Sequence, residues 1–139
     1  MEGDFLLESS AAAPDDVAVD DGTTRLTWSG LESRARRVAR ALAASGVTAD
    51  APWAILSHNR TEWVEMFLGN TMAGSRYVPL NWHLTAPELA YLLVNSGATL
   101  IVTEQGLEPV AGDAAAQAGL DPARILVIGS TYEAWRDAH

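Results

Sequence analysis

Cysteine is absent from this 139-residue sequence. Its absence excludes disulfide bonds, zinc sites built on thiolates, and catalysis by a cysteine nucleophile. Lysine is absent as well, so the nine residues of the combined Lys and Arg count are all arginines. A mechanism that depends on a lysine ammonium therefore cannot take that group from these residues.

Positive charge is scarce, because nine basic residues face 18 acidic ones and the net charge is −9. Such a chain offers no basic stripe to neutralise phosphates, so we expect no nucleic-acid partner and no binding to anionic membranes. Arg36, Arg37 and Arg40 fall on one face of an expected helix. Two interpretations of these arginines are open, a phosphate-binding site or a solvated helix face. The excess of acidic residues in the chain favours the solvated face.

Long apolar runs and a secretion signal are also missing. No run approaches the roughly 20 residues that cross a bilayer. The first residues, MEGDFLLESSAAAPDD, have neither the basic region nor the apolar region of a signal peptide. We therefore expect a cytoplasmic protein without a membrane span.

Short motifs for common chemistries are absent too. The sequence has no glycine-rich dinucleotide fingerprint, no phosphate-binding loop of the G-x-x-x-x-G-K-[ST] type and no G-x-S-x-G elbow. His58 and His83 follow two expected neighbouring strands and could approach each other, but Glu104 is the one carboxylate expected near them. Ordinary loop histidines are thus favoured over a metal site.

Apolar runs and helical patterns alternate along the chain. The runs at 53–57, 77–80, 98–102 and 125–128 have no wet face, and helical segments separate them. This order predicts an α/β fold in which a mostly parallel sheet is flanked by helices. An Asp-Gly pair within 17–28 predicts a small N-terminal β-ribbon. No composition shift marks a domain boundary within 1–139.

Three helix starts carry capping signals. Thr85 with Glu88 forms a capping box, and Gly97 is placed to end that helix. Ser29 with Glu32 predicts a second box, and Asn59 is expected to cap a helix over about 60–73. The apolar residues of this last helix spread nearly all round, which predicts that it is largely buried.

Taken in order, several segments resemble a known family. They are RLTWSGLESRARRVARALAASGV, WAILSHNRTEWVEMFLGNTMAGSRYVPLNWHLTAPELAYLLVNSGATLIVTE and STYEAWRD. From about Leu7 to the end, the chain is similar to the N-terminal subdomain of the adenylate-forming enzymes, the acyl-CoA synthetase or AMP-binding ligase family. The resemblance implies a partial N-terminal domain of that family over 1–139. It also implies a ligase of the fatty acid metabolism type.

The family uses ATP and Mg²⁺ to convert a carboxylic acid into an acyl-adenylate, then transfers the acyl group to CoA. Its Ser/Thr/Gly-rich phosphate loop, ribose-binding aspartate and catalytic lysine have no matching positions here, and the match ends before that loop. The resemblance therefore implies no catalytic residue, no metal ligand and no bound cofactor for this chain alone. It places His83 where some CoA ligases of the family contact the CoA nucleotide phosphates.

Three explanations of such a chain remain open. A separate chain could supply the rest of the ligase. Alternatively, the chain is a stand-alone half-domain that binds CoA, an acyl group or a partner. It is otherwise a non-functional gene remnant, for which we expect poor solubility because a buried parallel sheet would be left partly uncovered.

Overall fold

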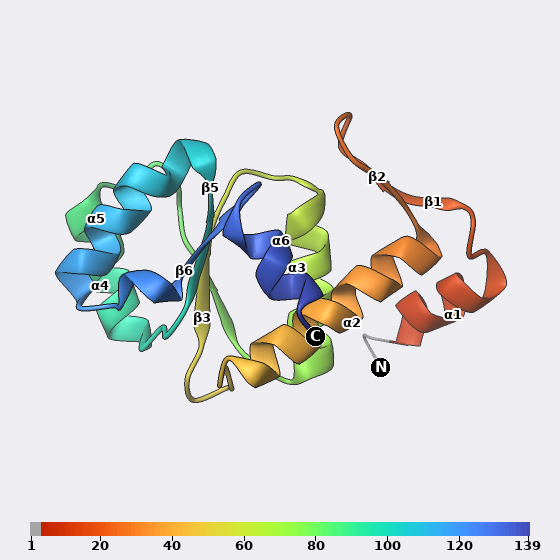
Figure 1. The fold of residues 1–139 in the computed structure, drawn as a ribbon, viewed down its shortest axis with the longest axis horizontal. Helices are drawn as coiled ribbons and strands as arrows, with labels where there is room; N and C mark the ends of the chain where they lie inside the picture. Colours follow the sequence, from red (N-terminus) through yellow and green to blue (C-terminus); the bar gives the residue numbers. More distant parts are fainter. Residues whose placement is uncertain (1–3) are drawn as a thin grey trace.

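The computed structural model describes residues 4–139, which form a four-stranded sheet, a two-stranded ribbon and the helices around them (Figure 1). The strands are β1 (Val17–Asp20), β2 (Arg25–Thr27), β3 (Trp53–Leu56), β4 (Tyr77–Pro79), β5 (Ile101–Glu104) and β6 (Ile125–Ile128). The helices are α1 (Asp4–Ala12), α2 (Trp28–Ala44), α3 (Thr61–Ala73), α4 (Ala86–Ser96), α5 (Glu108–Ala118) and α6 (Thr131–Asp137). Short 3₁₀ turns, η1 (Gln105–Leu107) and η2 (Pro122–Arg124), precede α5 and β6.

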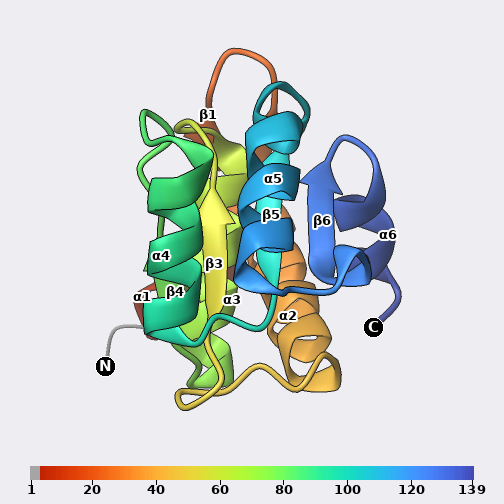
Figure 2. The same ribbon diagram turned by 90° about the vertical axis from the view of Figure 1, so that its left-hand side faces the viewer.

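The main sheet has the order β4-β3-β5-β6, and all of its neighbouring strands are parallel. Helices α4 and α5 cover one face, while α2, α3 and α6 cover the other (Figures 1 and 2). The predicted α/β class is thus confirmed, including the ribbon, in which β1 and β2 pair antiparallel. The third strand was expected at 98–102 but is Ile101–Glu104. The buried residues begin at Leu100, before the strand does, so a prediction from apolar residues alone placed the strand too early.

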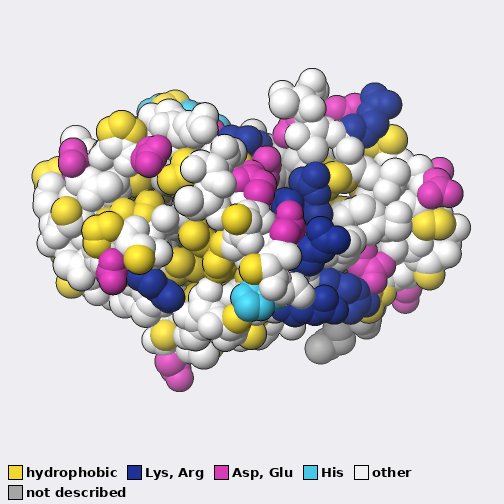
Figure 3. Space-filling view, in the orientation of Figure 1, with side chains coloured by type: hydrophobic (Ala, Val, Ile, Leu, Met, Phe, Trp, Pro, Cys, Tyr) yellow, Lys and Arg dark blue, Asp and Glu magenta, His cyan; other side chains and the backbone are white. Residues whose placement is uncertain are grey.

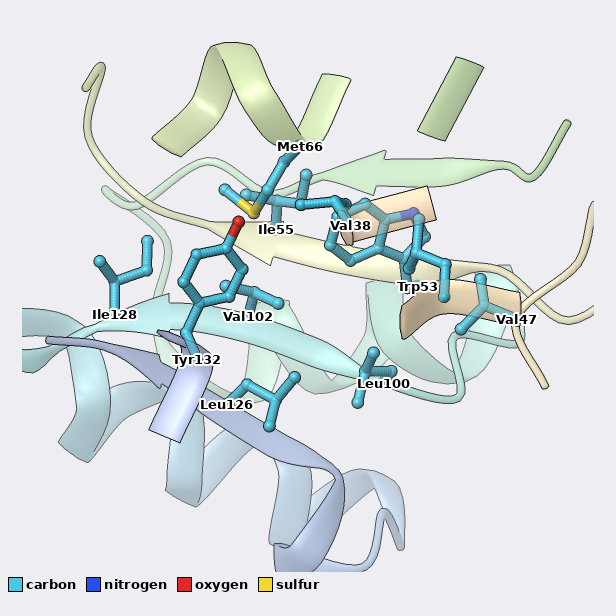
Figure 4. Close-up of a cluster of buried hydrophobic side chains, with 11 residues drawn as sticks. Val38, Val47, Trp53, Ile55, Met66, Leu100, Val102, Leu126, Ile128 and Tyr132 are labelled. Carbon is cyan, nitrogen blue, oxygen red and sulfur yellow. The ribbon is translucent and has the colours of Figure 1, made fainter. Parts of the chain in front are cut away.

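Each buried strand contributes to two cores, because successive side chains of a strand point to opposite faces. Trp53, Ile55 and Val102 pack with Tyr132 on the face of α2, α3 and α6 (Figure 4). Their neighbours on the other face pack against α4 and α5, and they include Ala54, Leu56 and Ile101. Because helices cover both faces of the sheet, these strands have no solvent-exposed face, as their apolar sequences indicated.

One of the three capping predictions is confirmed. Thr85 and Glu88 form the capping box of α4, and Gly97 ends that helix in the left-handed conformation with φ of 72°. The Ser29 prediction is wrong because Thr27 is the N-cap of α2. The Thr27 hydroxyl accepts from the Gly30 N–H at 3.1 Å, while Ser29 Oγ donates to the carbonyl of Pro14 instead.

The Asn59 prediction is also wrong, because α3 begins at Thr61 after Arg60. A carboxylate from the ribbon, that of Asp21, accepts from the Thr61 N–H at 2.9 Å. The capping group therefore comes from 40 residues away in the chain. A search for caps next to the helix cannot find it.

Helix α3 is only partly the apolar, buried helix that its composition predicted. Phe67 is 44% exposed, whereas Glu65 is fully buried and Asn70 is nearly so. The helix lies against α2 so closely that a β-carbon on Gly69 would stand 2.6 Å from the Val38 side chain. Hydrophobicity alone does not predict that Glu65 and Asn70 are buried, because these polar side chains bond to other helices and strands.

None of the helices within residues 4–139 is both long enough and apolar enough to cross a membrane.

Candidate functional site

The connections that leave β3 and β5 run to opposite faces of the sheet. Helix α3 follows β3 on one face, and α5 follows β5 on the other. Ligands of open parallel sheets bind beyond the carboxyl ends of two such neighbouring strands. Figure 2 shows these ends at the top of the sheet, with the turn of the ribbon above them.

A hollow of about 260 Å³ lies at this edge. We call it the switch-point hollow, and it is lined by Asp21, Thr23, Thr24, His58, Asn59, Arg60 and Glu104. The ribbon supplies the first three residues, the loop after β3 the next three, and the end of β5 the last. The sequence pointed to the two loops at this edge but not to the ribbon.

Glu104 is the centre of the hydrogen bonding in the hollow. Its Oε1 accepts from the backbone N–H of His58 at 2.6 Å and contacts the Nδ1 of the same residue at 2.5 Å. Its Oε2 accepts from Arg60 Nη1 at 3.1 Å. Burial by itself raises the pKa of the Glu104 carboxyl, but the His58 bonds and the Arg60 charge hold the pKa below its ordinary value.

Arg60 lies between two carboxylates. Its guanidinium donates to both oxygens of Glu62, at 2.8 and 3.3 Å, and also to Glu104. The Glu62 bonds raise the pKa of Arg60 despite partial burial, and the Glu104 charge adds to this effect. This guanidinium is therefore a fixed positive charge at the mouth of the hollow.

Asp21 ties the ribbon to the start of α3. Its carboxylate accepts from the backbone N–H groups of Thr23, Thr24 and Thr61, and from the Thr61 hydroxyl at 2.8 Å. These bonds, led by that of Thr24, hold the pKa of Asp21 far below its ordinary range. The ribbon is thus anchored over the carboxyl edge of the sheet.

His58 and His83 meet the same tryptophan. The ring of His83 stacks on Trp82 with centroids 3.6 Å apart, and the ring of His58 lies 4.2 Å from Trp82 at a tilt of 49°. The structure therefore brings both histidines to one edge, where each ring contacts Trp82. Trp82 is 40% exposed and His83 is exposed, so this group of rings borders solvent.

A metal ion needs several ligating side chains in one place, and a nucleotide needs positive groups for its phosphates. In the part of the chain that the structure describes, the carboxyl edge of the sheet offers neither set. Among residues 4–139, no group of three or more His, Asp and Glu side chains is placed to hold a metal ion. A triphosphate entering the hollow would meet the carboxylates of Asp21 and Glu104. The one guanidinium there, that of Arg60, is already paired with Glu62 and Glu104. The residues present therefore do not fit ATP with Mg²⁺.

The arginines of α2 lie on the solvated face that the acidic composition favoured. Arg36 pairs with Glu32 at 2.7 Å, Arg37 with Asp137 at 3.3 Å, and both side chains are nearly half exposed. Figure 3 shows a band of dark-blue side chains interspersed with magenta carboxylates on this side. Ion pairs of this exposed kind contribute little to stability and indicate no phosphate site.

Comparison with known proteins agrees with the layered fold and with the segments quoted above. The chain matches the AMP-binding enzyme family over residues 6–137 and belongs to that family. The match covers the sheet, its helices and the ribbon.

Curated relatives are similar over most of this chain. A fatty acid–acyl-carrier-protein ligase of Streptomyces coeruleorubidus is 32% identical over 114 residues, which are 82% of this chain and 21% of that protein. A feruloyl-CoA synthase of an Amycolatopsis species is 35% identical over 114 residues, 81% of this chain and 23% of that protein. The chain thus spans about a fifth of the length of these relatives.

Solved structures lead to the same conclusion. A fatty acyl CoA synthetase of Mycobacterium tuberculosis matches with a TM-score of 0.83 at 28% identity, over 97% of this chain and 28% of that chain. An anthranilate CoA ligase in complex with anthranoyl-AMP matches with a TM-score of 0.87 over 99% of this chain and 27% of that one. At 23% identity, this second match supports the fold alone. The chain corresponds to the N-terminal portion of longer acid ligases.

Proposed function

We propose that this chain serves as the N-terminal portion of an enzyme that activates a carboxylic acid with ATP and Mg²⁺ and then forms an acyl-CoA. The family match over residues 6–137 carries this proposal. Because the chain spans about a fifth of its curated relatives, a further segment or a separate chain would supply the remaining parts.

We also propose that residues 1–139 do not form an adenylate by themselves. Phosphate charge that develops in the transition state needs preorganised positive groups to stabilise it. The sequence has no lysine, and the guanidinium of Arg60 is paired with Glu62 and Glu104. The acid substrate, ATP, Mg²⁺ and CoA are thus assigned to the complete enzyme.

Exchange of radiolabelled pyrophosphate into ATP tests this assignment. We expect this chain alone, offered fatty and aromatic acids, to show no exchange above background. Clear exchange would contradict our account of the missing groups. The neighbouring reading frame should encode a Ser/Thr/Gly-rich loop if a partner chain exists, and adding that partner should then restore exchange.

A second candidate function is that of a stand-alone module that binds CoA. It rests on the exposed ring of His83, which stacks on Trp82 while the Asn81 side chain accepts from the His83 backbone N–H at 3.0 Å. The loop is therefore held in place with an imidazole edge free to meet solvent. We propose that His83 contacts the nucleotide phosphates of CoA.

Calorimetric titration with CoA tests the role of His83. We expect His83→Ala to abolish saturable binding and His83→Arg to retain it, since arginine is always charged. His139→Ala is the matched control, because that histidine is also exposed and belongs to a different segment, the one after α6. A flat titration of the unmodified chain would remove this candidate.

We prefer either function over a non-functional remnant. No buried side-chain nitrogen or oxygen atom in the described part of the chain lacks a hydrogen-bond partner. Helices cover both faces of the sheet, so we expect the purified chain to be soluble and to unfold cooperatively. Gradual unfolding without a transition would favour the remnant. We also propose that the protein is located in the cytoplasm, and cell fractionation tests this location.

A further inference from the structure

Four hydrogen-bond donors converge on the carboxylate of Glu104 at the carboxyl edge between β3 and β5. They are the backbone N–H and the ring Nδ1 of His58, the guanidinium of Arg60 and, at 3.5 Å, the hydroxyl of Ser57. Bonds from a guanidinium and from backbone N–H groups to an anion are charge-assisted and strong. The same set of donors suits the carboxylate or the phosphate of a small molecule.

Each donor is positioned by contacts that do not involve Glu104. The His58 N–H lies two residues after the end of β3, and the His58 ring lies against Trp82. Arg60 is held by two bonds to Glu62. The donors would therefore keep their places if the Glu104 carboxylate turned away, which is the preorganisation that a binding site needs.

The site also has an entrance. The donors border the switch-point hollow of about 260 Å³, whose other walls carry the hydroxyls of Thr23 and Thr24 and the amide of Asn59. The carboxylate of Asp21 also lines the hollow, but it already accepts backbone N–H bonds from Thr24 and Thr61. The Glu104 side chain is 15% exposed and belongs to the last residue of β5. For a ligand to reach the donors, this carboxylate has to leave them by rotation of the side chain, which changes nothing in the sheet.

We propose that the edge between β3 and β5 is an anion-binding site that the chain fills with its own Glu104, and that a small carboxylate or phosphate ligand competes with Glu104 for it. The proposal does not depend on ligase activity. The site is closed in the resting chain because an incoming anion must displace a tethered carboxylate. Removing that carboxylate frees the His58 donors and the Nη1 of Arg60 for the ligand, while Arg60 keeps its bonds to Glu62.

Glu104→Ala tests the proposal with inorganic phosphate as the probe. Titration is followed by the His58 amide and ring signals in two-dimensional NMR spectra. We expect the variant to bind phosphate at least about tenfold more tightly than the unmodified chain, because the competing state no longer reduces the population of open sites. Acetate, titrated in parallel, distinguishes a carboxylate ligand from a phosphate ligand.

Two matched variants complete the experiment. Glu108→Ala removes an exposed carboxylate four residues further along the chain and should behave as the unmodified protein. Combining Glu104→Ala with Arg60→Gln should abolish the gain. An absent His58 response in Glu104→Ala, or an equal gain in Glu108→Ala, would overturn the proposal. If Glu104→Ala fails to fold, the same titrations of Glu104→Gln decide, with a smaller expected gain.

Discussion

The two faces of the sheet are held together by different means. On the face of α4 and α5 the buried side chains are small or aliphatic, and they include Leu89, Leu93, Ala111 and Ala114. On the face of α2, α3 and α6 the core also contains buried polar groups bonded to one another. The first face needs only apolar residues of suitable volume, whereas the second needs particular partners in particular places.

Glu65 is the centre of the polar network. It is fully buried, and its Oε1 accepts from the Tyr132 hydroxyl at 2.7 Å and from Arg136 Nη1 at 2.9 Å. Its Oε2 accepts from Arg34 at 3.3 Å. Burial, together with the Glu65 charge, raises the pKa of Tyr132 well above its ordinary value. One carboxylate therefore links α2, α3 and α6.

Asn70 provides a second fixed point on this face. Its side-chain oxygen accepts from the Trp53 indole N–H at 2.9 Å, and its side-chain nitrogen donates to the Ser75 carbonyl at 3.0 Å. Helix α3 is thereby tied to the sheet by a directional bond as well as by packing. The comparison of the two faces suggests three experiments.

The largest effect should follow from Glu65→Ala. Removing Glu65 leaves the buried Arg136 with Asp137 as its remaining carboxylate and takes the acceptor from the Tyr132 hydroxyl. Breaking a buried pair in this way costs about 3–5 kcal/mol of unfolding free energy. Urea denaturation measures the loss. Glu108→Ala, which removes an exposed carboxylate on α5, should change stability by less than about 0.5 kcal/mol. A loss below about 1 kcal/mol for Glu65→Ala would mean that the network contributes little.

The same substitution should have opposite effects on the two faces. In Gly69→Ala the new β-carbon would meet Val38 at 2.6 Å and the Ala35 carbonyl oxygen at 2.8 Å. The overpacking should cost about 1–3 kcal/mol. In Gly112→Ala nothing lies within 4 Å, so the better helix propensity should stabilise α5 by about 0.5–1 kcal/mol. Thermal unfolding of both variants shows whether each change in stability is a loss or a gain. Two losses or two gains would contradict the difference in helix spacing.

The smallest effect concerns the start of α3 and depends on pH. The folded pKa of Asp21 lies below its ordinary value of 3.8, so folding favours the ionised form. The contribution of Asp21 is fully present above that value and is lost as pH falls toward the folded pKa. We expect the unmodified chain to be more stable than Asp21→Asn at pH 7, with the difference shrinking below about pH 4. Urea denaturation across pH 3–7 measures this, and a difference independent of pH would argue against a charged cap.

Local signals in the sequence predicted the parts of the fold that depend on neighbours in the chain. The capping box of Thr85 and Glu88 spans four residues, and Gly97 needs only its own backbone freedom. The alternation of apolar runs with helices led to the parallel sheet, and it also indicated which loops would meet at the carboxyl edge. The placement of His58, His83 and Glu104 near one another follows from that topology.

The bonds that shape the candidate site join residues far apart in the chain, and only the tertiary structure decided them. Asp21 caps α3 across 40 residues, and Glu104 reaches His58 across 46. Trp82 contacts two histidines because two parallel strands end at the same edge. The sequence by itself determined the family, the layers and the capping box of α4, since these depend on composition and on short spacings. The choice of partner for each polar group depended on which distant segments the sheet brings together.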